Sequence, residues 1–587
     1  LQDGAIKTNK IVEGGQIVGF NTSKGLNAPA QLKATGTATQ FNVTPVFTFG
    51  DSIGAFTPVG IPDGEGAYRK DANTIRLLVN AEVGKDKGYS YLLANGTEMT
   101  GARIQYFDVD INTSQVKNAG IAYSKVIDRF GSVVTDPTQI SGLTTAGSTV
   151  GFDRFCSANL FEKDTFGSGL GFKDRIFLMG EESSSVRNGL GGSMCALDVD
   201  NGVLYQLADM GYGSWEGATL VDTGDKNKVG IFLGDDSTPS FAMLYVGTKS
   251  TDPNAGFLER NGLVGGKMYV WAATDSTKKD PLTINGTGTT LPGSWVELKI
   301  RDTSKASTDP TSGYDSQGYL GIKAMHDAAL KLNAAAFARI EDEDYNHAAG
   351  KGNQVAFNAT GQTSNAAYKD TYGTTYTLDT TFKDGLPGAA TLKVVYDGDD
   401  KTNQQNGVRS QDNIAWARDG FIYLNEDRAI GTAGNATDDA LWGTQEGSVW
   451  KLDPSTGKAE RILQIDRSAL PTDPVTGKPM ADTFKGKIGE WETSGVIDVS
   501  DLYGHAPGTD FFTVVQAHGL QDGPIAANSL VEGGQILKFS NSKISSSDPT
   551  AASIKLSGDS YANRSLSDLI ASKPLTADSQ KLLDRYK

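Results

Sequence analysis

Residues 409–427 read RSQDNIAWARDGFIYLNED, and their pattern decides the fold. They predict a polar turn, a short strand, a tight turn at Asp419-Gly420, and an apolar strand that ends on Glu426 and Asp427. The same pattern occurs three more times, in LLVNAE (77–82), IFLMGEE (176–182) and IFLGDD (231–236). Their terminal acids are Glu82, Glu181, Glu182, Asp235 and Asp236. Four buried strands that end in acid suggest strand ends that converge on one place.

Converging carboxylates require a compensating charge. They repel one another and resist joint ionisation unless a cation lies between them. Oxygen-rich clusters suit hard cations such as Ca²⁺ and Mg²⁺. The alternative is that the four strand ends meet solvent at separate places. We expect a shared metal site.

The chain length favours a large closed architecture or several domains. Its 587 residues exceed the usual ceiling of about 250–300 residues for one simple core. Residues 1–17 recur as 520–536, because LQDG and the later VEGGQI appear in both segments at an offset of 519 (520 minus 1). Such an echo is natural when both ends of a chain occupy equivalent places in a ring. Hairpin-like units at 104–110, 194–204 and 449–459 resemble parts of propeller blades.

We therefore predict an all-β dominated protein, a β-propeller with insertions and a few peripheral helices. Residues 1–540 would form a single propeller domain whose N- and C-terminal strands meet, with insertions near 275–335 and 357–405. A helix is expected from about Ile322 to Ala338. Residues 541–587 would form a peripheral tail with a terminal helix from Thr576 to Tyr586.

The composition of the chain argues against some classes of binding partner. The formal net charge of −16 and the absence of a basic stripe argue against nucleic acid as a binding target. No apolar run approaches 18 residues, so no membrane span is expected. The chain opens without Met or a leader, which is expected of a mature exported protein, periplasmic or extracellular, with its signal peptide removed. A monomer that acts on small molecules is the expectation, with cell-surface association left open.

Catalytic motifs based on histidine or serine are missing. The chain has only four His, and it contains no HExxH motif, nucleophile elbow or P-loop. Carboxylates, cysteine and arginine remain. Cys156 is either a metal-ligating thiolate or half of a disulfide with Cys195. The spacing of the two cysteines in the sequence does not distinguish these alternatives. Arg339 beside Glu341 is either a phosphate-binding cation or half of a structural ion pair. His518, which ends another apolar strand, has a site role or a structural role.

Two acidic turns are candidates for calcium-binding loops. Residues 108–112 lack the glycine and the glutamate of such a loop and are interpreted as a hairpin turn. Residues 397–400, Asp-Gly-Asp-Asp, are a better peripheral Ca²⁺ candidate, with a solvated turn as the alternative.

An ordered set of motifs, from about residue 70 to 540, resembles the PhoX family of alkaline phosphatases. The set comprises Asn80-Ala81-Glu82, Arg154-Phe155-Cys156-Ser157, Glu181-Glu182, Trp215-Glu216, Asp235-Asp236, Arg339-Ile340-Glu341-Asp342, Asp412-Asn413, Glu426-Asp427, Glu492-Thr493-Ser494-Gly495 and Gln516-Ala517-His518. The resemblance implies an exported propeller phosphatase that hydrolyses phosphate monoesters, with Ca²⁺ and Fe³⁺ in the channel.

The resemblance also implies roles for individual residues. Cys156 would be an iron ligand, Glu216 and Glu492 would bind iron or bridge it to calcium, and Arg339 would hold the phosphate. The catalytic set is then Arg339, Glu341 and Cys156, and the substrate-binding set is Arg339, Arg409 and His518. The full metal-ligand set is Cys156, Glu82, Glu181, Glu182, Glu216, Asp235, Asp236, Glu341, Asp412, Glu426, Asp427 and Glu492.

This sequence departs from the family pattern beside several ligands. The usual His-Glu pairs are Ala81-Glu82 and Trp215-Glu216 here, and the usual Arg-Pro-Glu-Asp is Arg339-Ile340-Glu341-Asp342. Retained glutamates favour metal binding more than turnover. The alternatives are therefore a non-catalytic calcium-binding propeller, secreted or associated with a surface layer, and a calcium-only propeller hydrolase similar to phytases or lactonases.

Overall fold

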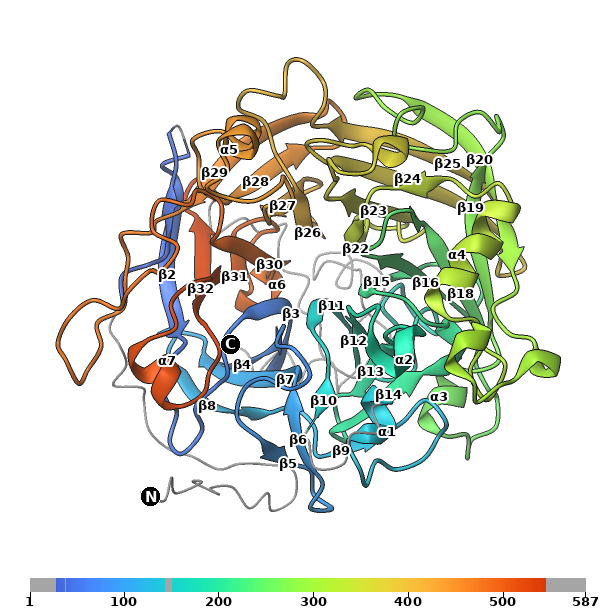
Figure 1. Ribbon diagram of the computed structural model, residues 1–587, viewed down its shortest axis with the longest axis horizontal. Helices are drawn as coiled ribbons and strands as arrows, with labels where there is room; N and C mark the ends of the chain where they lie inside the picture. Colours follow the sequence, from blue (N-terminus) through green and yellow to red (C-terminus); the bar gives the residue numbers. More distant parts are fainter. Residues whose placement is uncertain (1–27, 37, 143–149, 545–587) are drawn as a thin grey trace, which may run out of the picture.

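The computed structural model describes residues 28–36, 38–142 and 150–544. Six blades of β-strands radiate around a common centre and form a β-propeller (Figure 1). The inner strands are β3 (Pro62–Asp71), β11 (Phe155–Phe161), β15 (Trp215–Val221), β22 (Ile340–Tyr345), β26 (Gln411–Trp416) and β30 (Glu492–Asp498). Each inner strand contacts the next, and β30 contacts β3, so the ring is closed. The fold predicted from the sequence is confirmed.

Each blade continues outward by antiparallel pairing from its inner strand. In the first three blades the outer strands are β4 (Thr74–Ala81), β7 (Arg103–Asp110) and β8 (Val116–Ile121); β12 (Ile176–Glu181), β13 (Met194–Asp198) and β14 (Val203–Leu207); and β16 (Lys228–Asp235), β18 (Met243–Thr248) and β19 (Lys267–Ala273). In the last three they are β23 (Gln354–Ala359), β24 (Thr374–Lys383) and β25 (Leu386–Asp397); β27 (Ile422–Glu426), β28 (Ser448–Asp453) and β29 (Lys458–Ile465); and β31 (Asp510–Ala517), β32 (Gly533–Asn541) and β2 (Phe41–Thr48).

The apolar core lies between neighbouring blades. One buried cluster joins Leu78 and Ile104 of the first blade to Phe177 of the second, and a comparable cluster fills each of the other five interfaces. The second strand of a blade is therefore covered on both faces, and all six residues of β12 are buried. This double burial explains the continuous apolar runs that precede the terminal acids.

The last blade contains strands from both ends of the described chain. β2 pairs with β32 in register from Phe41 opposite Asn541 to Thr48 opposite Gln535. β31 pairs with the other edge of β32. This pairing closes the propeller and brings residues almost 500 positions apart into one sheet.

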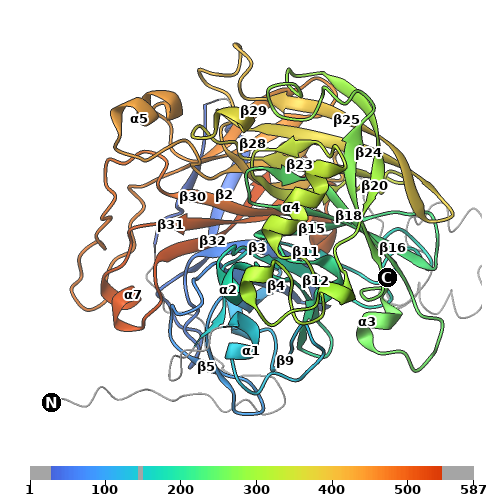
Figure 2. The same ribbon diagram turned by 45° about the vertical axis from the view of Figure 1, so that its right-hand side comes forward.

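The segment 275–335 leaves the ring, whereas most of 357–405 does not. β20 (Thr290–Leu298) pairs with β19 and with β25, so the third and fourth blades share one nine-stranded sheet. β24 and β25 are blade strands, so the expected insertion at 357–405 is largely part of the ring. Helix α4 (Ile322–Lys331) lies outside the inner strands (Figure 2) and is shorter than expected, because Asn333 adopts a positive φ of 56°.

The remaining elements are short and peripheral. Extra strands are β1 (Leu32–Ala34) on β29, β9 (Lys125–Ile127) on β14, and two small sheets formed by β5 (Tyr91–Leu92), β6 (Glu98–Gly101) and β10 (Gly151–Phe152), and by β17 (Ser240–Phe241) and β21 (Ala336–Phe337). The other α-helices are α1 (Thr138–Ser141), α2 (Val186–Gly189), α3 (Phe257–Arg260), α5 (Ala436–Trp442), α6 (Ser500–Tyr503) and α7 (Gly523–Ala527). Within the described ranges, no helix is long and apolar enough to cross a membrane. The predicted terminal helix at 576–586 and the first copy of the echo lie outside the described residues.

Candidate metal centre

Every inner strand has a β-bulge close to its first residue. The register shifts fall between Pro62 and Glu65, Phe155 and Ala158, Trp215 and Ala218, Ile340 and Glu343, Gln411 and Ile414, and Ser494 and Val496. A bulge re-aims a side chain and interrupts the ladder. In five blades, the residues inside the bulge are those that line the site.

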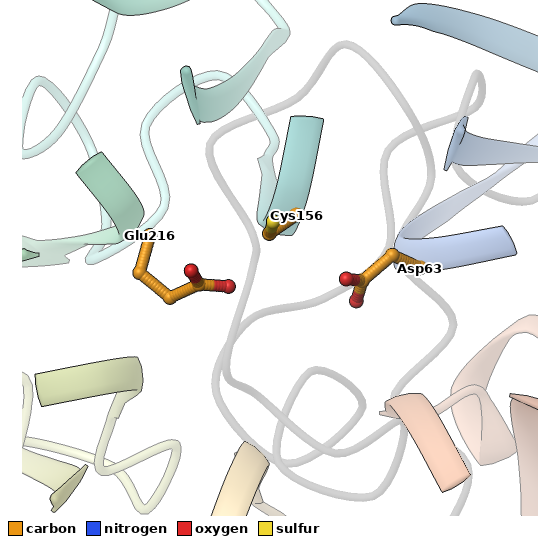
Figure 3. Close-up of side chains that lie close together, drawn as sticks. All are labelled: Asp63, Cys156 and Glu216. Carbon is orange, nitrogen blue, oxygen red and sulfur yellow. The ribbon is translucent and has the colours of Figure 1, made fainter. Parts of the chain in front are cut away.

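One side chain from each blade forms a ring around the channel, which we call the inner ring. Its members are Asp63, Cys156, Glu216, Glu341, Asp412 and Glu492, and all six are buried. Figure 3 shows Asp63, Cys156 and Glu216 with their reactive atoms pointing toward one another. Asp63 is the member that the sequence analysis did not include.

A second set, the outer ring, comes from the residue that follows the second strand of each blade. These residues are Glu82, Glu182, Asp236, Thr360, Asp427 and His518. The four acidic strand ends found in the sequence are therefore the same structural position in four blades. Their predicted convergence is geometric, because the second strands of all blades end on one side of the propeller.

Three of the strand ends carry two acids in a row. The side chain of the first acid in each pair points away from the other site residues. Glu181 Oε2 accepts a hydrogen bond from Arg187 Nη1 at 3.0 Å. Asp235 Oδ2 lies 2.8 Å from His326 Nε2, and Glu426 Oε1 accepts from the Arg409 backbone N–H at 2.9 Å. Among the described residues, none of these three belongs to a three-ligand group, and their predicted metal role stays a prediction.

Three groups of ligand atoms are close enough to hold an ion. They are Asp63, Cys156 and Glu216; Glu82, Cys156 and Glu182; and Glu216, Glu341 and Asp412. Within each group, the candidate ligand atoms all lie within 4.8 Å of one another. Cys156 and Glu216 each belong to two groups, so the groups form one continuous cluster.

The protonation of the inner ring reflects burial and crowding. Burial raises the pKa of Glu216, and the charges of Glu182, Glu341 and Asp412 raise it further. Burial and the neighbouring Glu82 raise the pKa of Asp63 to about 8. Cations between the carboxylates would remove this penalty. The donor set therefore fits bound cations, with one sulfur among oxygens.

Cys156 is a free thiol at the centre of the cluster. Its Sγ lies 3.0 Å from Glu182 Oε2, and burial together with Glu216 and Glu82 raises the pKa of the thiol. Cys195 is also free, so the alternative of a Cys156–Cys195 bridge is not realised. A thiol surrounded by acids is poorly ionised on its own, and a bound metal ion would deprotonate it.

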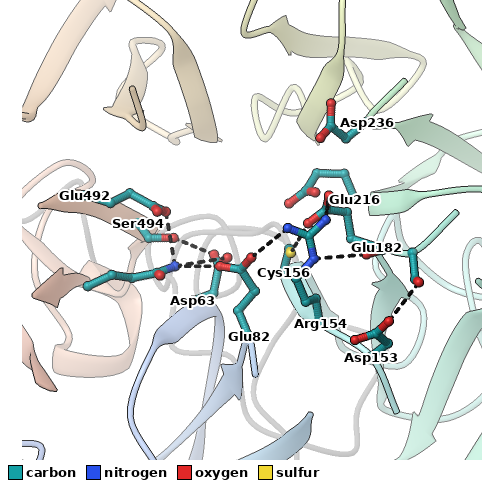
Figure 4. A network of polar contacts seen from close by, with 12 residues as sticks. Asp63, Glu82, Asp153, Arg154, Cys156, Glu182, Glu216, Asp236, Glu492 and Ser494 are labelled. Carbon is teal, nitrogen blue, oxygen red and sulfur yellow. Dashed lines mark hydrogen bonds and ion pairs between the residues drawn. The ribbon is translucent and has the colours of Figure 1, made fainter. Parts of the chain in front are cut away.

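Two arginines lie at the edge of the cluster with the same local geometry. Arg339 Nε and Nη2 donate to the two oxygens of Asp236 at 2.6 and 2.9 Å, and Nη2 lies 3.2 Å from Glu341 Oε1. Arg154 forms an ion pair with Glu182 and lies 3.7 Å from Glu82 Oε1 (Figure 4). Both residues precede an inner strand and have positive φ, 63° and 42°.

His518 and its neighbour Gln516 complete the site from the last blade. Gln516 Nε2 donates to Glu82 Oε2 at 3.0 Å and to Glu492 Oε1 at 3.1 Å. His518 Nδ1 hydrogen-bonds Glu532, and Nε2 lies 3.6 Å from Glu492 Oε2. Burial lowers the pKa of His518, but Glu532 and Asp427 outweigh burial and raise it.

Below the cluster, hydrogen bonds tie the blades together. Asp63 Oδ1 accepts from Ser494 Oγ at 2.5 Å and from Asn413 Nδ2 at 3.1 Å. Asn413 Nδ2 also donates to Ser157 Oγ at 2.8 Å. Three blades are thus joined through Asp63.

Two predicted regions lie apart from this cluster. The Arg409 guanidinium donates to the carbonyls of Leu441, Gly407 and Gln404. Its predicted substrate-binding role stays a prediction. In the 397–400 turn, Asp397 and Asp399 accept backbone hydrogen bonds from Gly286 and Thr371. Among the described residues, this turn forms no three-ligand group.

The sequence analysis missed Asp63 and gave no role to Arg154. A usable signal was present for both. Asp63-Gly64 repeats the acid-and-small pattern of Glu216-Gly217 and Asp412-Asn413 at the start of an inner strand. Arg154 precedes its strand as Arg339 does.

Comparison with known proteins places these features in a family. Residues 200–485 match the family model described as Alkaline phosphatase PhoX. No curated protein sequence matches the chain. The structure of Pseudomonas fluorescens PhoX in complex with vanadate, a transition state analogue, is similar with a TM-score of 0.55 and 15% identity, over 90% of this chain and 99% of that one. At this identity the likeness shows the fold.

Two other solved structures are similar only at a low level. A quinohemoprotein alcohol dehydrogenase from Comamonas testosteroni matches with a TM-score of 0.25 and 12% identity, over 84% of this chain and 62% of that one. A family 43 glycoside hydrolase from Bacillus subtilis matches with a TM-score of 0.26 and 10% identity, over 82% and 92%. Neither bears on function. The family match over residues 200–485 supports membership of the PhoX family of alkaline phosphatases, which are phosphoric ester hydrolases, and the six-bladed fold agrees with it.

Proposed function

We propose that the protein is an exported, metal-dependent phosphatase that hydrolyses phosphate monoesters in the propeller channel. The observation that carries the proposal is the continuous cluster of three ligand groups around Cys156 and Glu216, with Arg339 at its edge. An acidic site can attract an anionic ester only when cations and arginine outweigh the carboxylates. Export to the periplasm or the extracellular space is part of the proposal.

The chemistry of the donors fits two kinds of cation. Cys156 provides a soft thiolate and suits iron, with Asp63, Glu216, Glu82 and Glu182 as its neighbours. Glu216, Glu341 and Asp412 provide oxygen only and suit calcium. When bound, such cations would neutralise phosphoryl oxygens and lower the pKa of water. The identities Ca²⁺ and Fe³⁺ follow from the family resemblance and are part of the proposal.

The residues of the chain hold the ester and its protons. Arg339 offers a guanidinium fixed by Asp236, so its remaining donors can bind phosphoryl oxygens without reorientation. Glu341 forms an ion pair with Arg339 and also belongs to a group of candidate metal ligands. It would therefore connect the phosphate-binding arginine to the metal site. His518, held by Glu532, has an Nε2 that faces Glu492. His518 would supply a second N–H donor, two blades away from Arg339.

The test is metal content together with hydrolysis. Elemental analysis of the purified protein should find calcium and about two irons, as the family resemblance implies. The same sample should hydrolyse p-nitrophenyl phosphate. Calcium without iron, with turnover, would favour the calcium-only hydrolase. Bound calcium without hydrolysis of any phosphate ester, after reconstitution with calcium and iron, would favour the non-catalytic propeller and reject the proposal.

A further inference from the structure

The charges around the edge of the cluster alternate from blade to blade. Going around the propeller, the side chains are Glu82, Arg154, Asp236, Arg339, Asp427 and His518. Each comes from a different blade, at the start of the inner strand or directly after the second strand. The second blade also contributes Glu182, the partner of Arg154, and the nitrogen-bearing side chains Arg154, Arg339 and His518 lie on alternate blades.

Each acid lies between two of the nitrogen-bearing side chains. Glu82 lies 3.7 Å from Arg154, and its charge also acts on His518. Asp236 binds Arg339 in a bidentate pair and follows Arg154 in blade order. Asp427 follows Arg339 and precedes His518 in blade order. The acids that hold the three donors are Glu182 for Arg154, Asp236 for Arg339 and Glu532 for His518.

Exposure separates the donors from the acids that hold them. The side chain of Arg154 is 45% exposed, and those of Arg339 and His518 are 29% and 28% exposed. Their partners Glu182, Asp236 and Glu532 are 7–13% exposed. The nitrogen groups are consequently more accessible to solvent than the acids that hold them.

The Arg154 guanidinium has hydrogen-bond donors that its own acidic partners do not fully use. Its Nε donates to the Glu182 carbonyl at 3.2 Å and Nη2 pairs with the Glu182 carboxylate, whereas Nη1 has only the long 3.7 Å contact with Glu82. Figure 4 shows the guanidinium above Cys156, between Glu82 and Glu182. An anion that sits over the cluster would meet this group first.

We propose that Arg154 is a phosphate-binding residue that acts with Arg339 and His518 as a three-point clamp on a phosphoryl group. The inference rests on the proposed phosphatase function and deepens it. Three donors on alternate blades match the three terminal oxygens of a monoester. A diester has only two terminal oxygens and presents a second ester group to one of the donors. Arg154 is thus also a specificity residue that favours monoesters.

The test compares Arg154→Ala and Arg154→Lys with the wild-type protein, after loading with calcium and iron. The control is Arg69→Ala, which removes one exposed arginine from β3 at a distance from the site. Loss of a charge-assisted hydrogen bond should weaken the binding of inorganic phosphate, measured by calorimetry, about tenfold or more in Arg154→Ala. Arg154→Lys should recover part of this loss, and Arg69→Ala should match the wild type.

Kinetics and metal content complete the test. For Arg154→Ala, the KM for p-nitrophenyl phosphate should rise with the phosphate dissociation constant, and kcat/KM for bis(p-nitrophenyl) phosphate should fall less. Unchanged phosphate affinity at full metal content would overturn the proposal. Loss of bound metal in Arg154→Ala would also overturn it, because Arg154 would then serve only to position Glu182. Phosphate binding tests the clamp even if the wild-type protein hydrolyses nothing, so failure of the proposed function stays distinguishable.

Discussion

Asp63 illustrates how one residue depends on its neighbours in this site. Ser494 and Asn413 hydrogen-bond one of its oxygens, while its thiol and carboxylate neighbours Cys156 and Glu216 belong to the same ligand group. Burial raises its pKa to about 8, so at neutral pH the metal-free side chain keeps its proton. Hydrogen bonds from two other blades hold the carboxyl in place. Whether the carboxyl is ionised depends on whether a cation is bound beside it.

Replacing Cys156 separates the iron-dependent enzyme from its alternatives. We expect Cys156→Ala to lose iron and at least about 100-fold in kcat/KM, because the sulfur belongs to two ligand groups. Cys195→Ala is the matched control, since Cys195 is an equally buried free thiol that pairs with Met179 inside a blade. Elemental analysis and hydrolysis rates measure both. Full activity in Cys156→Ala would reject a role for the thiolate.

Asp108 supports a pH prediction outside the site. Burial alone would raise the pKa of Asp108, but Arg76 and Lys70, at 2.7 Å each, outweigh burial and lower it. A lowered pKa contributes stability that is present above the unfolded value of 3.8 and is lost as the pH falls through the folded value. We expect Asp108→Asn to cost about 2–3 kcal/mol at pH 7, since it leaves two cations without their shared partner.

The pH dependence provides the check on this assignment. Chemical unfolding of wild type and Asp108→Asn should differ at pH 7, and the difference should shrink as the pH falls below 3.8. Asp110→Asn, two residues along the same strand, removes an exposed pair with Lys117 and should change stability little. A difference that persists unchanged in acid would show that packing, rather than charge, explains the loss.

Single residues were only partly predictable from the sequence. The acid pairs at strand ends were visible, but alternation along a strand does not say which acid of a pair faces the channel. Glu182 and Asp236 do, while Glu181 and Asp235 face Arg187 and His326. Asp63 was missed because it does not end an apolar run. The bulge that contains Asp63 arises from the pairing of β3 with β4. This pairing cannot be predicted from the sequence of β3 alone.

At the scale of elements, the bulges make the site possible. A regular strand turns successive side chains to opposite faces, so it offers the channel only alternate residues. The bulge in β11 lets Cys156 reach the cluster while Ser157 meets Glu216 and Asn413. The bulge in β22 similarly places Glu341 beside Arg339 and directs Asp342 to the backbone N–H of Ile414.

Gly64 offers a test of the contact between two bulges. A Cβ at this position would lie 2.3 Å from the backbone N of Ala158 and 2.6 Å from the carbonyl O of Cys156. We expect Gly64→Ala to force β3 and β11 apart, to lower the melting temperature by several degrees, and to reduce metal content. Gly388→Ala is the control, because its nearest neighbour is the Thr381 carbonyl O at 3.6 Å. Equal melting temperatures and metal contents for both variants would contradict the close packing.

Composition misled the prediction for 357–405. Thr, Gly, Asn and Asp are frequent there, which is typical of excursions, yet β24 and β25 are the outer strands of the fourth blade. Outer strands need an apolar face only on the side that packs against the next blade. Tyr376, Leu378, Leu392 and Val394 provide this face, while polar residues alternate with them. Thr-rich strands with such alternation are therefore compatible with a blade.

For the whole molecule, the site is a meeting point of all six blades. Burying six acidic or thiol side chains together costs free energy that the apolar interfaces between blades must offset. The predicted division into a propeller of residues 1–540 and a tail of residues 541–587 stays a prediction, as does the monomeric state. Family-level resemblance told us more about this assembly than periodicity did, because blades far apart in sequence supply neighbouring ligands.

Metal removal should act on the protein as a whole. The candidate ligand atoms of each group lie within 4.8 Å, and deprotonated carboxylates at this separation repel unless a cation is present. We expect a chelator to lower the melting temperature at pH 8 more than at pH 5, because protons replace the missing cations at more of the carboxylates in acid. Calorimetric metal titrations in buffers of different ionisation enthalpy should show proton release. Identical melting curves with and without chelator at pH 8 would refute a structural contribution of metal.

The pairing of β2 with β32 has a consequence for biosynthesis. A ribosome delivers β2 early, but its partner emerges only once residues 533–541 have been made. Until then the last blade lacks its central strand, and Glu492 and His518 have no finished sheet to hold them. The nascent chain therefore cannot assemble the complete ring, and a truncated translation product would not acquire a working centre. Metal acquisition should therefore follow the synthesis of residues 533–541.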